Sequence, residues 1–421
     1  MNMEEPSPGD RDGHGPLEHL TVLDFTRVLA GPFATMMLAD LGAEAFKVEP
    51  LDSGDEARGF GPFRGGSSGY FAGVNRGKKS IALDLKTDRG VEIALEMAEG
   101  ADILVENFRP RVMERLGLGW DQVHALNPAL IYASCSGFGQ TGPYAERPAY
   151  DVIVQAMSGL MSITGPENTL EPVRAGASLA DLSAATFTVI GVLAALQERE
   201  RTGMGRRVDV GMLDSMVALL ENAITRYDVT GETPSPLGTR HPSIAPFQVF
   251  ATQDGHVAVR AANQRIWERL CHALNAEELL ADPSYQNNKT RTDNHGRLNT
   301  ALEPIFSQRT TAEWLEELDK ASVPAGPVNK VSDIVADRHI RTRGMIHEVR
   351  APGNVSFQTA GQPIHMDPAL DRPSDYAPAL GEHTREVLGN RLGMSARELQ
   401  NLAGAHVTGG PAPEPEADSD S

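Results

Sequence analysis

The stretch LTVLDFTRVLAGPFATMMLADLGAEAFKVE, residues 20–49, decides the fold. Residues 20–25 are a short β-prone run, residues 33–41 carry a helical pattern, and residues 45–49 form a second β-prone run. Pro32 opens the helical segment, where the first position of a helix tolerates proline. The stretch therefore predicts a βαβ unit. Its turn lacks the G-x-G-x-x-G spacing, which disfavours a nicotinamide dinucleotide site.

The same alternation continues along the chain. Further β-prone runs lie at residues 79–85, 102–106 and 130–136, and a helical pattern covers residues 89–99. Strands that alternate with helices of about ten residues predict an α/β fold with a parallel sheet covered on both faces. Ligands bind to such sheets at the carboxyl ends of the strands. The loops expected at this edge, which carry basic or amide groups, are residues 84–86, 107–109 and 136–139.

Charge limits the choice of partners. The 421 residues include 38 basic and 57 acidic side chains, for a net charge of −19. This balance argues against nucleic acid or an anionic membrane surface as the main partner. An anionic ligand needs a local basic patch, and residues 76–115 hold the first concentration of Lys and Arg in the chain. That concentration fits either a phosphorylated ligand or a solvated face paired with nearby acids.

Cysteine and histidine usage indicates no metal and no disulfide framework. The two cysteines, Cys135 and Cys271, lie far apart, and the twelve histidines show no metal-ligand spacing. We therefore expect a cytoplasmic protein without a metal or a permanently bound cofactor. We also expect no membrane segment, because the amino end shows no leader pattern and the longest apolar run, near Phe187, has about ten residues.

Composition divides the chain into five segments. Residues 1–16 and 405–421 are rich in Pro, Gly and acidic residues and are predicted to be disordered tails. A break near residue 233 begins a smaller α+β domain, residues 233–325, whose residues 246–259 predict a hairpin around Asp254-Gly255. The large domain is then expected to comprise residues 17–232 and, after the chain returns, residues 326–404.

Asp181 is the main candidate for chemistry. It lies between the small residues 175–178 and the apolar segment 187–196. An aspartate, with a reference pKa of about 3.9, is ionised at neutral pH and can attack an acyl carbon without the adjacent base that a serine needs. The alternative is that Asp181 caps the helix that follows, which is a common role for aspartate. Spacing alone leaves both roles open.

Several motifs together resemble the class III CoA-transferase family (CaiB/BaiF type), closest to the acetyl-CoA:oxalate and formyl-CoA:oxalate CoA-transferases. The resemblance runs from about Leu17 to Leu392, with the motifs in the same order. It implies a Rossmann-like large domain built from both chain ends, a small central domain, and two chains interlocked in a homodimer. The motifs are DFTRVLAGPFATMMLADLGAEAFKVEP, GDEARGFGP, NRGKKSIALDLKTDRG, ADILVENFRPRVMERLG, NPALIYASCSGFGQTGPY, SLADL with TGMGRRVDVGMLDS, VPAGPVN and LGEHTREVL.

The resemblance also implies a reaction in which Asp181 is the nucleophile and coenzyme A is a co-substrate. CoA would pass from an acyl-CoA to a small carboxylate through an aspartyl mixed anhydride and an enzyme–CoA thioester. Leu29 and Pro50 differ from the glutamine and arginine of the formyl-CoA subgroup, so acetyl-CoA or succinyl-CoA is the expected donor. The positions that match the family's CoA contacts are Val28, Leu83, Asp84, Leu85, Lys86, Asn107, Phe108, Arg109, Arg115 and Tyr150.

Two alternatives stay open. An α-methylacyl-CoA racemase of the same fold needs an acid/base pair. Tyr150, with a reference pKa near 10, stands where the racemases carry a histidine, and tyrosine is a poor base at pH 7. A non-catalytic CoA-binding protein is the second alternative, and it requires Asp181 to be unreachable by a ligand.

The acceptor is expected to be a small dicarboxylate, with oxalate first. The segments RPAYDVIVQAMSGLMSITG and LGTRHPSIAPF are most similar to the acetyl-CoA:oxalate branch. The second carboxylate of such an acid needs a cation, for which Arg240 and His241 are the candidates, with Arg174 a weaker one. An ordinary turn or surface role for them is equally consistent with the sequence.

Overall fold

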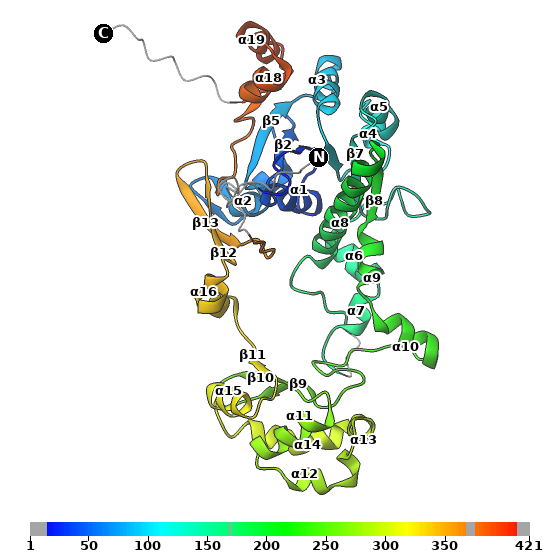
Figure 1. The fold of residues 1–421 in the computed structure, drawn as a ribbon, viewed down its shortest axis with the longest axis vertical. Helices are drawn as coiled ribbons and strands as arrows, with labels where there is room; N and C mark the ends of the chain where they lie inside the picture. Colours follow the sequence, from blue (N-terminus) through cyan, green and yellow to red (C-terminus); the bar gives the residue numbers. More distant parts are fainter. Residues whose placement is uncertain (1–14, 168, 170, 368–374, 411–421) are drawn as a thin grey trace, which may run out of the picture. The chain divides into compact units, whose positions relative to one another are not determined.

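The computed structural model describes residues 15–167, 169, 171–367 and 375–410. The chain folds into two compact units, each built from separate segments (Figure 1). The second unit begins earlier and ends later than the small domain expected from composition. Of the described residues, the first unit comprises 15–159, 175–221, 340–367 and 375–410, and the second comprises 160–167, 169, 171–174 and 222–339.

A seven-stranded sheet forms the centre of the first unit, with the order β14-β5-β2-β1-β6-β7-β8. Neighbouring strands are parallel except β14, which runs antiparallel to β5. This confirms the predicted α/β class with a parallel central sheet. The strands are β1 (Thr21–Asp24), β2 (Glu44–Glu49), β5 (Lys78–Leu83), β6 (Ile103–Glu106), β7 (Ile131–Ser136), β8 (Arg207–Gly211) and β14 (Thr408–Gly409).

Helices cover both faces of this sheet. On one face, α3 (Asp88–Glu99), α5 (Trp120–Leu126), α18 (Thr384–Leu392) and α19 (Ala396–Gly404) share a core with side chains of the central strands. On the other face, α1 (Ala30–Asp40) and α8 (Leu179–Thr202) pack against the alternate side chains of the same strands. Strands apolar on both faces are typical of buried parallel sheets.

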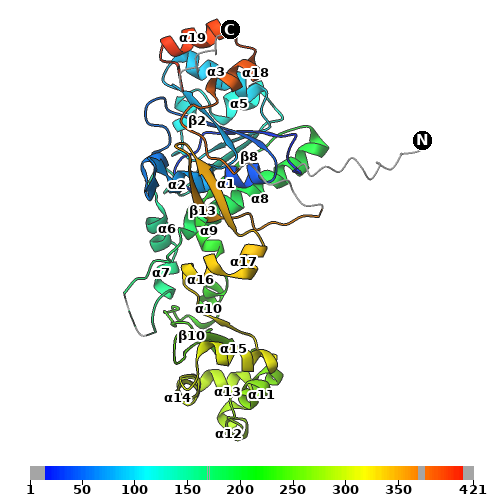
Figure 2. The same ribbon diagram turned by 90° about the vertical axis from the view of Figure 1, so that its left-hand side faces the viewer.

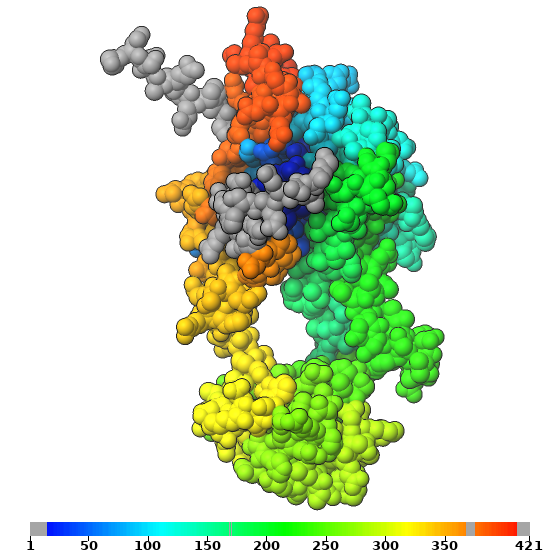
Figure 3. Space-filling view, in the orientation of Figure 1, coloured from blue at the N-terminus to red at the C-terminus, as the bar shows by residue number. Residues whose placement is uncertain are grey.

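Figures 1 and 2 both place α18 and α19 beside α3, at the end of the unit where α5 also lies. In the space-filling view of Figure 3 the orange and red surface of residues near 390 adjoins the blue surface of residues near 90. Buried Val387 and Leu388 of α18 belong to the same core cluster as Ile93 of α3. Segments from the two ends of the chain therefore share one core.

Residues 405–410, which composition assigned to a tail, are part of the fold. Thr408 and Gly409 pair with Leu83 and Ala82 at the edge of the sheet. Val407 is buried in the core, and its carbonyl accepts a hydrogen bond of 2.9 Å from the Asp84 N–H. Short polar strands of this kind carry no hydrophobic pattern, which explains why composition misses them. Residues 1–14 and 411–421 lie outside the described residues.

The helix α8 is longer than the apolar run near Phe187 suggests. It spans 24 residues and, by length and composition, is the only described helix apolar enough to cross a membrane. The expectation that this segment is too short does not hold. Its buried face, which includes Ala185, Val189 and Val192, packs in the core of the first unit. We therefore interpret α8 as a core helix of that unit.

A hairpin of β12 (Ile346–Ala351) and β13 (Val355–Ala360) packs with α2 (Gly69–Asn75) at another side of the first unit. Phe71, Val349 and Phe357 form the centre of this smaller core. The remaining short elements of the unit are η1 (Glu56–Gly59), β3 (Phe63–Arg64), β4 (Ser67–Ser68), α4 (Val112–Arg115), α6 (Asp151–Met157) and α9 (Met212–Ala218).

The second unit is built around an antiparallel sheet with the order β11-β10-β9. The predicted hairpin is present as β9 and β10. The core of the second unit contains Phe250, Trp267, Phe306 and Trp314. The chain passes from the second unit to the first within α17 (Arg338–Thr342). The elements of the second unit are α7 (Leu160–Ile163), α10 (Asn222–Thr230), β9 (Phe247–Ala251), β10 (His256–Arg260), α11 (Gln264–Ala273), α12 (Glu278–Ala281), η2 (Pro283–Tyr285), α13 (Asn288–Asp293), α14 (His295–Phe306), α15 (Thr311–Lys320), β11 (Ala325–Pro327) and α16 (Val331–Ala336).

The pairing of β14 predicts an effect of truncation. Deleting residues 405–421 removes the burial of Val407 and the pairing of Thr408–Gly409 with β5. At about 1.5 kcal/mol for the side chain and about 1 kcal/mol per hydrogen bond, we expect a loss of roughly 3 kcal/mol of unfolding free energy. Urea denaturation measures it. The matched control deletes only residues 411–421, and equal effects of the two deletions would contradict a structural role for β14.

Candidate active site

A pocket in the first unit contains Asp181 at the carboxyl edge of the sheet. Its walls come from the loops after β1, β6 and β7, from residues 145–150 and from the start of α8. Parallel strands bring these loops to one edge, as the sequence predicted for two of them. The residues expected at the site that line this pocket are Val28, Asn107, Phe108, Arg109, Tyr150 and Asp181.

Asp181 is the third residue of α8, and its side chain is partly exposed. Ser178 occupies the N-cap position, so the alternative that Asp181 caps the helix is wrong. The amino end of a helix favours a negative charge, because its unpaired N–H groups point outward. This places a carboxylate in the pocket in an environment that suits its charged form.

Asp151 holds the first turn of α8. Its Oδ1 accepts a hydrogen bond of 3.0 Å from the Ala180 N–H, and Gln155 Nε2 donates to its Oδ2 at 2.9 Å. Gln155 Oε1 in turn accepts from the Ala175 N–H at 3.0 Å. The buried face of α6 therefore fixes the backbone on both sides of the small-residue run before Asp181.

Asn107 connects two of the pocket loops. Its Oδ1 accepts a hydrogen bond of 2.9 Å from the Arg27 N–H, and its Nδ2 donates to the Arg27 carbonyl at 2.8 Å. The Arg27 guanidinium lies 5.4 Å from the centre of the Phe108 ring. The loop after β6 therefore supports the turn after β1.

Three guanidinium groups line the pocket in a chain that is acidic as a whole: Arg27, Arg109 and Arg147. Arg27 forms an ion pair of 2.7 Å with Glu56, and Arg147 lies over the Tyr144 ring at 4.2 Å. Such groups suit a phosphorylated ligand. The sequence identified Arg109 alone as a site residue; Arg27 adjoins the predicted Val28, and Arg147 opens the segment RPAYDVIVQAMSGLMSITG, whose resemblance gave it no role.

A glycine lets two walls of the pocket approach each other. A Cβ atom added to Gly137 would lie 2.1 Å from the Ala149 Cβ, which is far closer than any real contact. Gly137 follows β7, and Ala149 precedes Tyr150 in the opposing wall. Any larger residue at position 137 would displace the segment that carries Arg147 and Tyr150.

Two further side chains bear on the chemistry. Burial raises the pKa of the Cys135 thiol to about 12, so this lining residue stays protonated at neutral pH. Burial, followed by the carboxylates of Asp181, Asp55 and Asp151, raises the pKa of Tyr70. Tyr70 of α2 therefore shares the electrostatic environment of Asp181, although nothing in the sequence pointed to it. Among the described residues, no group of three or more His, Cys, Asp or Glu side chains is placed to hold a metal.

Other residues expected at the site lie outside this pocket. Leu83 is buried in the core, so its side chain faces no ligand, while Asp84, Leu85 and Lys86 follow at the end of β5. Arg115 is exposed at the end of α4. These residues share the first unit with the pocket, but the lining of the pocket does not include them.

Arg240 and His241 belong to the second unit, where both have local partners. Arg240 forms an ion pair of 2.8 Å with Glu167. The His241 ring stacks on Phe247 with centres 5.2 Å apart, and its Nδ1 accepts from the Ser243 N–H. Their proposed contact with an acceptor stays a prediction.

The sequence profile described as CoA-transferase family III matches residues 17–384. The chain belongs to this family. An acetyl-CoA:oxalate CoA-transferase of Acetobacter aceti is 46% identical over 371 residues, which cover 87% of this chain and 95% of that protein. A succinyl-CoA:glutarate CoA-transferase of Mus musculus is 40% identical, with 93% and 90% covered.

The chain is also similar to a CoA-transferase named for another acceptor and to a family protein with a solved structure. A succinyl-CoA:mesaconate CoA-transferase of Haloarcula hispanica is 40% identical, with 89% of this chain and 96% of that protein covered. The crystal structure of a CAIB/BAIF family protein from Brucella suis superimposes with a TM-score of 0.79 at 36% identity, covering 90% and 100% of the two chains. This chain is therefore a CoA-transferase enzyme of family III.

Glu106 of this CoA-transferase lies directly before Asn107 and is almost fully buried. Burial raises its pKa to about 7, and a hydrogen bond of 2.8 Å from the Phe108 N–H offsets this only in part. Between about pH 4.5 and 7 the folded state holds a proton that the unfolded state has released. The contribution of Glu106 to stability therefore falls as the pH rises through this range.

The loss of stability that Glu106 causes as the pH rises can be tested with a variant that cannot ionise. We expect the unfolding free energy of Glu106→Gln to rise relative to that of the native chain as the pH increases from about 5 to about 7. Above that range the gain levels off at about 3 kcal/mol. Thermal unfolding at several pH values measures the difference. Glu99→Gln, which changes an exposed carboxylate at the end of α3, is the control. A difference that does not change with pH would contradict the assignment.

Proposed function

We propose that this CoA-transferase moves CoA from acetyl-CoA or succinyl-CoA to a small dicarboxylate, with oxalate the first candidate and Asp181 as the nucleophile. One observation carries the proposal: a partly exposed carboxylate at the amino end of α8 lines a pocket with three guanidinium groups. The carboxylate suits acyl chemistry, and the guanidinium groups suit the phosphates of CoA.

The reaction balances without a metal, a nucleoside triphosphate or a proton donor. A carboxylate oxygen of Asp181 attacks the thioester carbon of the donor, the C–S bond breaks, and CoA leaves as a thiolate. The thiolate then attacks the aspartyl carbonyl of the mixed anhydride and releases the donor carboxylate. The acceptor carboxylate attacks the resulting aspartyl thioester and again expels the thiolate. Attack of the thiolate on the acyl carbonyl of the acceptor yields the new acyl-CoA and restores Asp181.

The chemistry of the pocket supports Asp181 over the other nucleophile types that line it. The Cys135 thiol is protonated at neutral pH, and Ser136 needs a base. The described lining residues include no histidine, which also disfavours the racemase alternative. The non-catalytic alternative required Asp181 to be unreachable by a ligand. Its partial exposure in a pocket argues against that alternative.

We propose that the CoA moiety extends from this pocket along the carboxyl edge of the sheet toward β5. Leu83 to Lys86 would then offer main-chain groups and the Lys86 ammonium, and Arg115 would add a second cation. The exposure of Lys86 and Arg115 supports this placement. Val28, Asn107, Phe108, Arg109 and Tyr150 would contact the part of CoA nearest the thioester.

The relatives support a dicarboxylate acceptor, since their names refer to oxalate, glutarate and mesaconate. Oxalate takes first place because that relative has the highest identity of the three. Leu29, an apolar residue in the pocket, suits an acyl chain better than the formyl group. Arg240 and His241 remain our candidates for the second carboxylate.

A donor and acceptor screen tests this proposal. Acetyl-, succinyl- and formyl-CoA are each incubated with oxalate, succinate, glutarate, malate, mesaconate and itaconate, and new CoA esters are identified by mass. We expect oxalyl-CoA from acetyl-CoA or succinyl-CoA. Asp181→Asn is expected to reduce transfer by at least about 10³-fold, because the amide is not a nucleophile.

The matched control is Asp102→Asn. Asp102 pairs with Arg199 near the other end of α8, at 3.0 Å, and does not line the pocket. Peptide mass spectrometry of the native chain with acyl-CoA should find the mass of CoA less one water on the peptide with Asp181. Unchanged transfer by Asp181→Asn would refute the nucleophile. Loss of stereochemistry from a chiral 2-methylacyl-CoA, without any transfer, would favour the racemase.

We also propose that two copies form the interlocked homodimer implied by the family resemblance. Phe187, Ile190 and Leu193 recur at helical spacing on α8 and are exposed in the single chain. Burial of such a stripe against a second copy would remove apolar surface from water. Light scattering should give twice the mass of the chain, and a mass of one chain would contradict the proposal.

A further inference from the structure

The turn after β1 holds a residue in an unfavourable conformation. Val28 has a φ of +67°, in the left-handed region that β-branched residues rarely adopt. Val28 and its neighbours Leu29 and Ala30 line the pocket that contains Asp181. Strained backbone of this kind persists only where surrounding groups enforce it.

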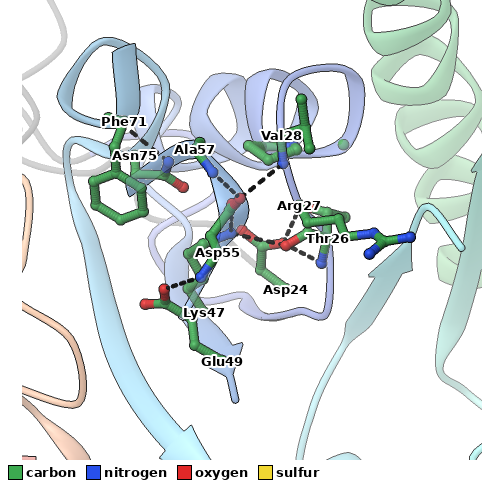
Figure 4. Close-up of polar contacts among 12 residues, drawn as sticks. Asp24, Thr26, Arg27, Val28, Lys47, Glu49, Asp55, Ala57, Phe71 and Asn75 are labelled. Atoms are coloured by element: carbon green, nitrogen blue, oxygen red, sulfur yellow. Dashed lines mark hydrogen bonds and ion pairs between the residues drawn. The ribbon is translucent and has the colours of Figure 1, made fainter. Parts of the chain in front are cut away.

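Three side chains hold the main chain of this turn, one at each residue. Lys47 Nζ donates to the Thr26 carbonyl at 2.8 Å, and Asn107 bonds both main-chain groups of Arg27. Asp55 Oδ1 accepts a hydrogen bond of 2.9 Å from the Val28 N–H. Figure 4 shows Lys47 and Asp55 below the turn, with Asp55 directed toward the Val28 nitrogen.

Lys47 and Asp55 form one buried unit. Lys47 Nζ lies 2.8 Å from Asp55 Oδ2, and their side chains are 0% and 1% exposed. The Asp55 N–H donates to Glu49 Oε2 at 2.9 Å, and Asp55 Oδ1 also accepts from the Ala57 N–H at 2.9 Å. Contacts other than that with Val28 therefore hold both the backbone and the carboxylate of Asp55 in place.

Neither member of this pair lines the pocket. Their influence on the reaction would therefore pass through main chain that carries lining residues, namely the turn and Glu56, which directly follows Asp55. A buried charge pair is also weak evidence for added stability, since desolvation offsets the attraction. Its two bonds to the turn, at Thr26 and Val28, give it a specific role in shaping one wall of the pocket.

We propose that Lys47 and Asp55 are positioning residues that hold Val28 in the left-handed conformation and thereby fix one wall of the pocket that contains Asp181. This inference rests on the proposed function of that pocket. Without the pair, the Val28 N–H loses its acceptor and the turn relaxes toward the extended region that valine prefers. Leu29 and Ala30 then move with it.

The test replaces Asp55 by asparagine, which keeps an acceptor oxygen and nearly the same volume but removes the charge opposite Lys47. The matched control is Asp40→Asn. Asp40 pairs with Arg76 at 2.6 Å with both side chains 2% exposed, and it contacts neither the turn nor the pocket lining. Both variants break a buried ion pair, so their unfolding midpoints are expected to fall by similar amounts.

Only Asp55→Asn should affect the site. We expect kcat/KM for the acyl-CoA to fall about 10- to 100-fold, the cost typical of a small displacement of the groups that position a substrate. Hydrogen–deuterium exchange of the peptide with residues 26–30 should accelerate in Asp55→Asn and stay native in Asp40→Asn. The exchange measurement does not depend on catalysis, so it separates failure of this inference from failure of the proposed function.

Native exchange at residues 26–30 together with native kcat/KM in Asp55→Asn would overturn the inference. If that variant does not fold, Val28→Gly and Val28→Ala decide the matter, since both remove the same side-chain branches. Glycine adopts the left-handed region freely, so Val28→Gly should unfold at a higher temperature than Val28→Ala. The reverse order would show that the turn is not held against strain and would equally overturn the inference.

Discussion

The buried charges under the carboxyl edge of the sheet are the constraint on which the first unit depends. Asp24 and Lys47 lie opposite each other on β1 and β2, and each has a buried partner of opposite charge, Lys78 for Asp24 and Asp55 for Lys47. A buried charge that loses its partner costs about 3–5 kcal/mol, so these residues can change only together. Glu49 extends the network to Arg58, which donates to the Pro378 carbonyl, and to Ser80, which accepts from the Gly381 N–H. The returning segment of the chain is thereby attached to the same network as the first βαβ unit.

We propose that this network matters for function, because it contacts a loop that lines the candidate active site. A parallel sheet places its loops at one edge, but it does not fix their conformation. Here the turn after β1 is fixed from below by Lys47 and Asp55 and from the side by Asn107. Asp151 does the same for the start of α8. Two walls of the pocket are thus held largely by side chains that do not line it, Lys47, Asp55 and Asp151, while Asn107 both supports the turn and lines the pocket.

The sequence predicts the parallel sheet well because its strands are apolar on both faces and its helices are amphipathic or buried. The same reasoning misses β14, since Thr408 and Gly409 carry no hydrophobic pattern and depend on Val407 for their placement. It identifies Asp181 as a candidate but leaves its capping role open, because only the structure shows Ser178 at the N-cap. The ion pairs escape prediction for a different reason. Lys78 and Asp24 are 54 positions apart, and a charged residue inside a β-prone run indicates burial only when its partner is known. Tyr70 lies in a segment without a recognisable motif, and the resemblance of the segment that begins at Arg147 gave that residue no role, so only the fold connects the two with Asp181.

The proposed exchange through an aspartyl anhydride would also explain why relatives of similar identity are named for different acids. Every covalent step takes place at a carboxyl or thioester carbon, and none of them involves the remainder of the acid. The groups that act on those carbons therefore serve any donor or acceptor equally, and selectivity must come from residues that contact the rest of each molecule. In the pocket of the first unit, we propose that Leu29 is such a residue on the donor side, where an apolar side chain would favour an acyl chain over hydrogen. For the acceptor, a second carboxylate requires a cation with strict geometry, since an unpaired buried charge is far more costly than a poorly filled apolar space. A single well-placed guanidinium can therefore discriminate between dicarboxylates of different length more sharply than the shape of the pocket can.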